Sequence, residues 1–281
     1  QHTGLSVSFR IDDGIIEHNN RSFIAKNVVR ERIPDNITYK KQNIREFYSE
    51  LFGEALAEYN SRMKRRDRII ADYYEHIRKG KQEKTFEEIV VQFGDINDCS
   101  VGSENGELAK QMLDQYMRGF ETRNPNLKVF NAVMHLDEAT PHLHIDFVPI
   151  THTGSRGLST RVSMSGALRE MGFAPENKFL TEWVAWSDSE RAVMEKILRE
   201  HGLYRDDKNV HREHWSVDEY KRKKQAAQEI RSMNDHINAL KKKSDDSYTS
   251  EEIAAIKNQN DYMRSEITKR DEKIAALSRQ V

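Results

Sequence analysis

The stretch HLDEATPHLHIDFVP, residues 135–149, decides the fold expected for the chain around it. Its second half alternates in polarity, and successive side chains of a β-strand point to opposite faces. His142, His144 and Asp146 therefore share one face of a strand, while the apolar residues between them share the other, buried face. Residues 127–135 are also strand-like, and the short polar connection closed by a proline predicts an antiparallel hairpin.

The hairpin would place His135, at the end of the first strand, beside His142 and His144. Three imidazoles on one patch of a sheet form a candidate metal site, because neutral imidazole is a common ligand of divalent metals. A single His on a strand is usually an ordinary surface or core residue, and a His-x-His pair alone is a weak signal. Three of the eleven histidines within ten residues, flanked by two acids, favour the metal site.

These residues also resemble the metal motif of the MobV (Mob/Pre) relaxases, which are plasmid mobilisation and recombination enzymes of the HUH endonuclease class. The similar pattern is His-x-Asp-Glu-x-Thr-Pro-His-x-His, continued by Phe-Val-Pro. The resemblance implies that His142 and His144 are the "HUH" pair of metal ligands and His135 the third. It covers roughly residues 5–205 and implies an α+β fold in which helices flank an antiparallel sheet.

A second motif lies near the N-terminus. His18-Asn-Asn-Arg21 resembles the His-Asn-x-Arg box of the MobV family, and residues 27–36 resemble the Asn-rich segment that follows this box. The family segment ends in Asn-Tyr, but Ile37 stands at the Tyr position here. Tyr39, two residues further on, is a possible shifted equivalent.

The resemblance implies a covalent mechanism. In part of the MobV group, a His of the His-Asn-x-Arg box attacks phosphorus and keeps the cleaved DNA end attached, and His18 stands at that position. An imidazole can attack when one nitrogen is unprotonated and a carboxylate accepts the N–H of the other. We expect Glu138 to be that carboxylate, Arg21 to clamp the scissile phosphate, and Tyr39 to be the reserve nucleophile.

The ligands partly determine which metal ion is expected. Three neutral imidazoles leave a divalent ion its full charge and leave coordination positions open for phosphodiester oxygens. We expect Asp137 or Asp146 to orient the ligand imidazoles by accepting their N–H groups. Ligand softness alone accepts Zn, Co, Ni or Cu, whereas the resemblance favours Mn²⁺, with Mg²⁺ as the second choice.

Composition sets limits on the class of protein. With 281 residues, 37% of them hydrophobic and 32% charged, the chain can form one large domain and a solvated helical appendage. The net charge of −1 means that any DNA surface must come from local patches. Cys99 is the single cysteine, which excludes an intramolecular disulfide and fits a reducing bacterial cytoplasm. The sequence contains no apolar run of membrane-spanning length and no visible signal peptide, and its first residue, Gln1, suggests a processed form or a fragment.

Hydrophobic periodicity predicts the other elements. The predicted strands span residues 5–11, 86–93, 127–135 and 142–149. Amphipathic helices are expected at 43–64, 108–120 and 165–171, and another from Ser187 or Asp188 to Gly202, with Trp183 and Trp186 in a core segment before it. Together these elements predict an antiparallel sheet with helices on one face.

Two stretches carry local positive charge. The first contains Arg62, Arg65, Arg66 and Arg68, and the second is a loop rich in Gly and hydroxyl groups that carries Arg156 and Arg161. Guanidinium groups and loop N–H groups can contact a phosphate backbone. We expect both stretches to bind single-stranded DNA, although a solvated helix face and an ordinary hairpin connection are the alternatives.

The composition changes beyond residue 205. We therefore expect a relaxase domain at 1–205 and a helical hairpin or coiled-coil region at 206–281. Heptad spacing runs from Ile253 to Val281, with Asn260 and Arg270 at polar positions of the seam. The seam can be satisfied by the chain folding back on itself or by a second chain, which would make a homodimer or a complex with another partner.

The expected function is site-specific nicking and strand transfer of single-stranded DNA at a transfer origin of a plasmid or mobile element, through a covalent 5′-phosphate–protein intermediate. One alternative is a metal-dependent phosphodiester hydrolase in which water attacks. Another is a non-catalytic DNA-binding adaptor that dimerises through the coiled coil. A covalent adduct distinguishes the first from the second, and nicking distinguishes both from the third.

Overall fold

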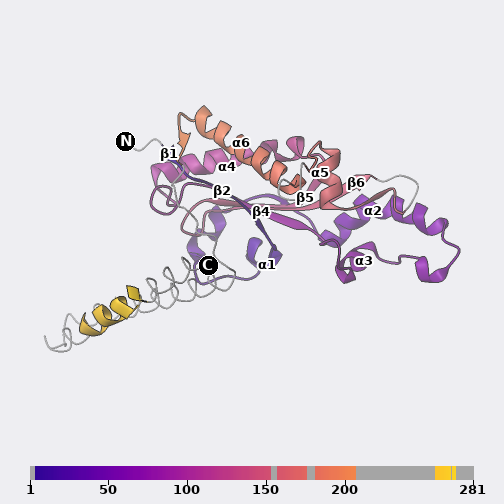
Figure 1. Ribbon diagram of the computed structural model, residues 1–281, viewed down its shortest axis with the longest axis horizontal. Coiled ribbons are helices and arrows are strands. Elements are labelled where there is room, and N and C mark those ends of the chain that lie inside the picture. The colour runs from indigo at the N-terminus through magenta and orange to yellow at the C-terminus, as the bar shows by residue number, and fades with distance from the viewer. Residues whose placement is uncertain (1–3, 153–156, 176–180, 207–256, 267, 270–281) are drawn as a thin grey trace. The chain divides into compact units, whose positions relative to one another are not determined.

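A computed structural model of the chain describes residues 4–152, 157–175, 181–206, 257–266, 268 and 269 (Figure 1). The chain divides into two compact units, Gln1–Asn209 and Val210–Val281, whereas we expected a boundary at 205/206. The described residues of the second unit are helical. Asn260 and Met263, two of the expected seam positions, are partly buried there; most of the predicted heptad seam lies outside the described residues.

The first unit is built around an antiparallel sheet in the order β2-β4-β6-β5-β3, with β7 paired to the end of β6. The strands are β2 (Val7–Asp12), β3 (Ile37–Lys41), β4 (Glu87–Phe93), β5 (Leu127–His135), β6 (His142–His152) and β7 (Thr160–Val162). A separate parallel pair joins β1 (Gly4–Leu5) to β8 (Tyr204–Arg205).

The central hairpin is the predicted one. β5 and β6 pair with His135 opposite His142, and the register shifts once between Val129 and Asn131. β4 lies on the other side of β6, where Glu88 is opposite Asp146. These central strands are buried along most of their length because helices cover parts of both sheet faces.

One face of the sheet carries α4 (Glu104–Arg123), α5 (Met164–Glu170) and α6 (Glu182–Glu200) (Figure 1). Their apolar side chains pack on Leu143, Ile145 and Phe147 of β6, all fully buried. α2 (Ile44–Ser61) and α3 (Tyr73–Lys79) pack on Phe130 and Val148, on the opposite face. Helices therefore lie on both faces, not on one as expected, because an amphipathic pattern shows which side of a helix is buried but not which sheet face covers it.

The helix starts follow N-cap chemistry. Asn43 accepts hydrogen bonds from the second and third backbone N–H groups after it, at the start of α2. Thr181 caps α6 by accepting from the N–H of Val184. The prediction that this helix begins at Ser187 or Asp188 was wrong, because Thr181 is an equally good cap and places both tryptophans inside the helix. Sequence periodicity also missed β3 and the short helix α1 (Ile16–Asn19).

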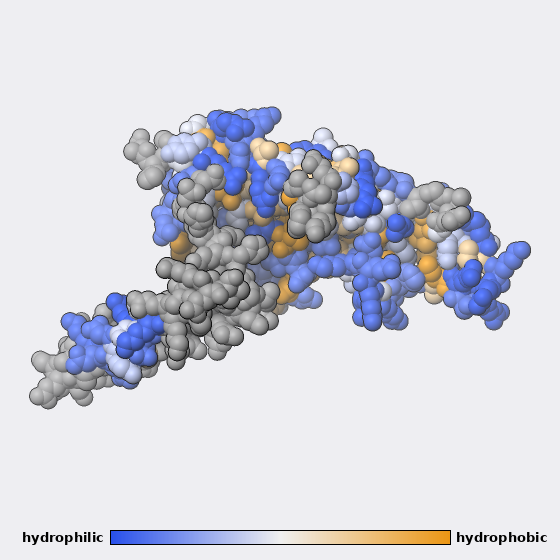
Figure 2. All heavy atoms as spheres, in the orientation of Figure 1, coloured by the Kyte–Doolittle hydropathy of each residue, from blue (hydrophilic) through white to orange (hydrophobic). Residues whose placement is uncertain are grey.

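The connection from β2 to β3 contains α1 and the 3-10 helix η1 (Arg30–Asp35), and a second short 3-10 helix, η2 (Arg66–Arg68), follows α2. The side chain of Asn19, in α1, contacts β4 and β6 on the sheet face where α2 and α3 also pack. Hydrophilic residues cover most of the surface visible in Figure 2. Among the residues that the structure describes, none of the helices is long and apolar enough to cross a membrane.

Candidate active site

The three hairpin histidines converge on one face of the sheet, as predicted. The ring centroids are 4.6 Å apart for His135 and His144, 5.2 Å for His135 and His142, and 5.1 Å for His142 and His144. The cause is the strand geometry, since His142 and His144 point to the same side of β6 and His135 is the cross-strand neighbour of His142.

Each of these rings has one nitrogen bonded to an oxygen acceptor. The bonds are His135 Nε2 to the carbonyl of Asn19 at 2.9 Å, His142 Nδ1 to the carbonyl of Thr140 at 2.8 Å, and His144 Nδ1 to Glu88 Oε1 at 2.5 Å. A carbonyl or carboxylate oxygen only accepts, so the bonded nitrogen carries the proton and the other nitrogen of the same neutral ring keeps its lone pair.

These lone pairs fit a metal ion. His135 Nδ1 and His144 Nε2 are buried and have no hydrogen-bond partner among the residues that the structure describes. A buried polar atom without a partner destabilises the folded protein. A divalent cation would remove this cost, because the lone pair of a neutral imidazole nitrogen can coordinate it. Burial lowers the pKa of His135, His142 and His144, so the rings are neutral and ready to act as ligands. The unpaired nitrogens of His135 and His144 therefore fit a divalent metal.

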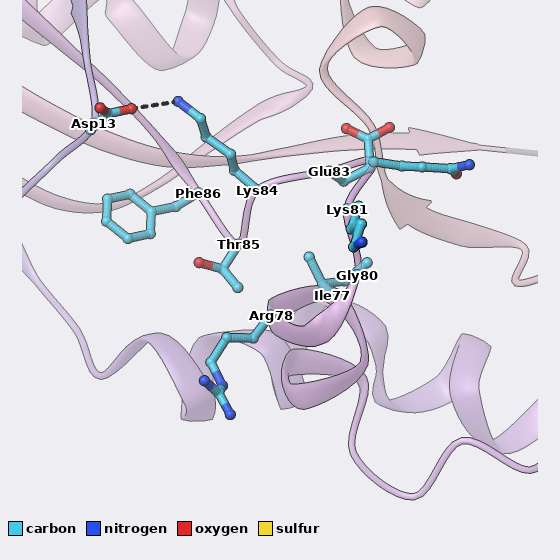
Figure 3. A pocket seen from close by; sticks show the side chains of 10 residues that line it. Asp13, Ile77, Arg78, Gly80, Lys81, Glu83, Lys84, Thr85 and Phe86 are labelled. Carbon is cyan, nitrogen blue, oxygen red and sulfur yellow. Dashed lines mark hydrogen bonds and ion pairs between the residues drawn. The ribbon is translucent and has the colours of Figure 1, made fainter.

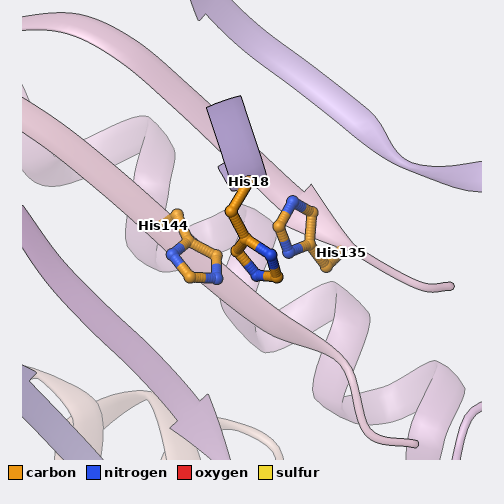
Figure 4. Close-up of side chains that lie close together, drawn as sticks. All are labelled: His18, His135 and His144. Carbon is orange, nitrogen blue, oxygen red and sulfur yellow. The ribbon is translucent and has the colours of Figure 1, made fainter. Parts of the chain in front are cut away.

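Helix α1 brings a fourth imidazole to the cluster. The ring of His18 is 5.6 Å from that of His135 and 5.9 Å from that of His144, centroid to centroid. Figure 4 shows His18 lying with His135 and His144, and one nitrogen of each ring lies within 4.8 Å of the others. The side chain of His18 is 23% exposed, whereas that of His135 is fully buried. A substrate can therefore reach His18 directly.

Glu138 lies between His18 and the hairpin rings. Its Oε1 is 3.5 Å from His18 Nε2 and 3.9 Å from His135 Nδ1. The same carboxylate groups with His135 and His142 as a possible ligand set. The predicted partner of His18 is thus beside it, and the position also allows Glu138 to contribute to the metal site.

Arg21 is placed differently from the expectation. Its Nε and Nη2 bond to the two oxygens of Asp137 at 2.7 and 2.6 Å, Nη2 also bonds to Glu138 at 2.9 Å, and Nη1 bonds to the carbonyl of His18 at 3.0 Å. A guanidinium has five donors, so a single Nη1 hydrogen remains, beside the His18 ring. The expected contact of Arg21 with a phosphate would therefore use this one hydrogen, and the other contacts of Arg21 fix the acidic loop.

Asparagines of the second motif hold the same loop. Asn36 donates to Asp137 at 2.7 Å and accepts from the backbone N–H of Leu136 at 2.7 Å. Asn27 donates to Glu138 Oε2 at 2.6 Å. The Asn-rich segment therefore lies against the connection between β5 and β6 and positions its carboxylates. The sequence resemblance indicated this segment but gave no role for its side chains.

The carboxylate that orients a ligand ring is neither Asp137 nor Asp146. Asp146 accepts from Asn19 and Asn131, and Asp137 accepts from Arg21 and Asn36. Glu88 takes the expected role by accepting the N–H of His144. Sequence reasoning missed it because Glu88 meets His144 only through the pairing of β4 with β6, which leaves no local signal.

Burial also affects this group of acids. It raises the pKa of Glu88 to about 7, and burial and Glu88 together raise the pKa of Asp146 to about 7. The amide nitrogen of Asn19 donates to both carboxylates, at 2.8 Å to Glu88 and 3.0 Å to Asp146. These three polar side chains therefore form a hydrogen-bonded cluster beside His144 on the same face of the sheet.

Tyr39 lies on the opposite face of the sheet. Its hydroxyl donates to Asp114 of α4 at 2.9 Å, and its ring packs against the core beneath α4 and α6. Burial raises the pKa of the phenol most, and the hydrogen bond to Asp114 raises it further. The expectation of a reserve nucleophile at Tyr39 is corrected by this placement, because strand alternation directs the side chain away from the histidines.

The arginines predicted to bind DNA lie in the connection between α2 and α3 and in the loop and strand β7 that follow β6. Arg62, Arg65, Arg66, Arg68 and Arg161 are exposed, and Arg156 lies outside the described residues. Arg62 donates to the carbonyl of Gly157 at 3.2 Å, which brings the two basic stretches together. Arg65 pairs with Asp67 at 2.7 Å.

Comparison with known proteins gives one family match. The sequence model of a family described as plasmid recombination enzyme (Mob_Pre) matches residues 13–171. No curated protein sequence matches the chain at significant similarity.

Two solved structures illustrate the structural similarity. One is the Mn-bound MobM relaxase domain (MOBV; Mob_Pre) with 22 nucleotides of plasmid pMV158 oriT DNA at pH 5.5; it has a TM-score of 0.44 and 18% identity, over 77% of this chain and 98% of that chain. The other is the same domain with 26 nucleotides of oriT DNA, at a TM-score of 0.36 and 15% identity, over 76% of this chain and 99% of that one.

Proposed function

Because the chain belongs to the plasmid recombination enzyme (Mob_Pre) family, we propose that it nicks and rejoins single-stranded DNA at the transfer origin of a plasmid or mobile element in the bacterial cytoplasm. One observation carries the proposal. The half-buried imidazole of His18 lies beside the buried, neutral imidazoles of His135 and His144, with one nitrogen of each ring within 4.8 Å of the others. A nucleophile beside a metal site is an arrangement that can transfer a phosphodiester.

His135, His142 and His144 would hold a divalent cation, which we propose to be Mn²⁺, with Mg²⁺ as the other choice. When bound, the cation stabilises negative charge on the phosphodiester oxygens and orients the phosphate. Glu88 and the carbonyls of Asn19 and Thr140 keep the ring protons on the far nitrogens, so the near nitrogens stay free to coordinate.

The chain's own residues would carry the transfer. A nitrogen of His18 attacks phosphorus, a P–N bond forms, and the P–O3′ bond breaks; the 3′ end leaves as an alkoxide that takes a proton from the solvent, and the 5′ phosphate remains on the protein. Glu138 would accept the N–H of the attacking ring and stabilise the imidazolium that develops. Arg21 holds Glu138 in place and has its remaining Nη1 hydrogen beside the His18 ring. Rejoining is the reverse attack by a 3′ hydroxyl.

The exposed arginines and the heptad region have proposed binding roles as well. The exposed arginines Arg62, Arg65, Arg66, Arg68 and Arg161 would contact the DNA backbone. A homodimer or another partner would use the heptad region of the second unit.

The nucleophile is tested by adduct formation. The protein is incubated with Mn²⁺ and a panel of labelled single-stranded oligonucleotides, and covalent species are separated on a denaturing gel. The wild type and Tyr39→Phe should form an adduct, and His18→Ala should form none. His76→Ala, which removes an exposed imidazole on α3, is the matched control and should behave as the wild type. Free products without an adduct would identify a hydrolase that uses water, and no cleavage at all would identify a DNA-binding adaptor.

The metal assignment has its own test. Replacing both His142 and His144 by Ala should abolish measurable Mn²⁺ binding in calorimetry and abolish nicking, because a single ligand imidazole remains in the hairpin. His18→Ala should still bind Mn²⁺. Metal-dependent nicking that survives the double replacement would show that the cation is held elsewhere.

A further inference from the structure

A cleft of about 540 Å³ opens between the end of α3 and the beginning of β4 (Figure 3). Its volume is in the range of small-molecule sites. The lining residues come from the last turn of α3, from the connection to β4 and from the residue before Gly14: Asp13, Ile77, Arg78, Gly80, Lys81, Gln82, Glu83, Lys84, Thr85 and Phe86.

The cleft adjoins the proposed active site. Phe86 directly precedes β4 and packs with Phe130 and Val148 on the sheet face where Glu88, the second residue of β4, contacts His144. Glu88 is the carboxylate that holds His144. At the other wall, Asp13 precedes the turn that leads into α1 and His18. A strand of DNA that leaves the histidine cluster on this face therefore meets the cleft next.

The lining combines apolar, polar and charged groups, and the carboxylates of Asp13 and Glu83 are among the charged ones. Ile77 and Phe86 are apolar, and Gln82 and Thr85 can exchange hydrogen bonds with the edge of a base. Lys81 is exposed and forms no ion pair with any residue that the structure describes. This lysine is the cation that remains available to an incoming anion.

The other two cations of the lining are occupied. Lys84 pairs with Asp13 at 2.9 Å and with Glu87 at 3.4 Å. Arg78 pairs with Glu75 at 2.8 Å. These pairs fix the walls of the cleft, and they leave Lys81 as the group that selects for negative charge.

We propose that this cleft binds one nucleotide of the single-stranded DNA next to the scissile phosphate. The base lies against Phe86 and Ile77, and its phosphate lies at Lys81. Proteins that hold single strands without reading their sequence stack bases on aromatic side chains and contact the phosphates with cations. The inference rests on the proposed function, because it assigns a path to the strand that His18 would cut.

The test compares two charge reversals in the same segment. Lys81→Glu changes the cleft, and Lys79→Glu is the matched control, an exposed lysine of α3 that does not line it. The probe is a fluorescein-labelled, random-sequence single-stranded oligonucleotide, and anisotropy is measured in a chelating buffer over a series of salt concentrations. Lys81→Glu should weaken binding about tenfold at low salt and reduce the slope of log K against log salt by about 0.7, the value for one phosphate contact on a single strand. Lys79→Glu should change the affinity less than twofold.

Every other result overturns the proposal. Equal losses in the two variants would mean a general charge effect, and unchanged binding by Lys81→Glu would mean that the cleft is not on the path. If excess thymidine 5′-monophosphate removes the difference between the wild type and Lys81→Glu, the cleft binds free nucleotides instead of the strand. Thermal unfolding of both variants confirms that each is folded.

The adduct assay keeps this inference separate from the nicking proposal. If the wild type forms no adduct but the Lys81→Glu effect is present, nicking fails and the cleft stands. If the wild type forms an adduct and Lys81→Glu binds normally, the cleft fails and nicking stands.

Discussion

At the scale of the residue, Glu88 shows how the sheet tunes a ligand. Its Oε1 accepts the N–H of His144 at 2.5 Å and a second bond from Asn19 at 2.8 Å. Such partners of a ligand imidazole hold the ring and raise its basicity, and their loss commonly reduces metal affinity 10–100-fold.

Glu88→Gln tests this role. The substitution keeps the shape of the side chain but weakens the acceptor, so we expect Mn²⁺ affinity to fall by about tenfold in calorimetry while the protein stays folded. Glu87→Gln is the matched control, since Glu87 is the neighbouring buried acid and pairs with Lys84 instead of an imidazole. Equal affinity for the two variants would mean that the hydrogen bond to His144 does not support the metal site.

The sequence predicts the donors of the site better than it predicts their partners. His135, His142 and His144 follow from a hairpin and strand alternation, which are local rules. Glu88 becomes a partner through strand pairing, which no local rule specifies, and the expected roles of Asp137 and Asp146 were misplaced for the same reason.

At the scale of the element, Glu170 joins the end of α5 to the end of β6. It accepts hydrogen bonds from the hydroxyl of Thr151, from the N–H of His152 at 2.6 Å and from Asn126 at 2.7 Å. Burial opposes its charge, but these bonds prevail and lower the pKa of Glu170 to about 2.

This carboxylate should contribute a measurable pH dependence of stability. The pKa in the folded protein lies below the value of about 4.3 for an unfolded glutamate, so the unfolded chain binds more protons between these values. The stabilisation is complete above about pH 4.3 and is lost as the pH falls towards 2. The difference in Tm between wild type and Glu170→Gln should therefore be largest near neutral pH and shrink below about pH 4. A difference that does not change with pH would contradict the ionic role of Glu170.

Long amphipathic helices were easier to predict than short elements. α2 and α4 carry several turns of apolar spacing and were expected near their observed positions. α1 has four residues, too few to show a period, and β3 lies in a stretch that we interpreted only as a motif. The role of His18 was therefore expected from the resemblance to a family, whereas the helix that carries it was not predicted.

At the scale of the whole molecule, the proposed active site joins two distant parts of the sequence. The hairpin that ends near residue 149 provides the metal donors, and α1 provides His18, more than a hundred residues earlier. The loop formed by Asp137 and Glu138 connects them through Arg21. Sequence patterns predict each part, but the strand order that brings them together comes from packing on both faces of the sheet.

The most direct test is to map the covalent product. The adduct formed with Mn²⁺ and single-stranded DNA is digested, and the modified peptide is identified by mass spectrometry. We predict that the nucleotide is attached to the imidazole of His18. Attachment to Tyr39 or to any other side chain would contradict the account.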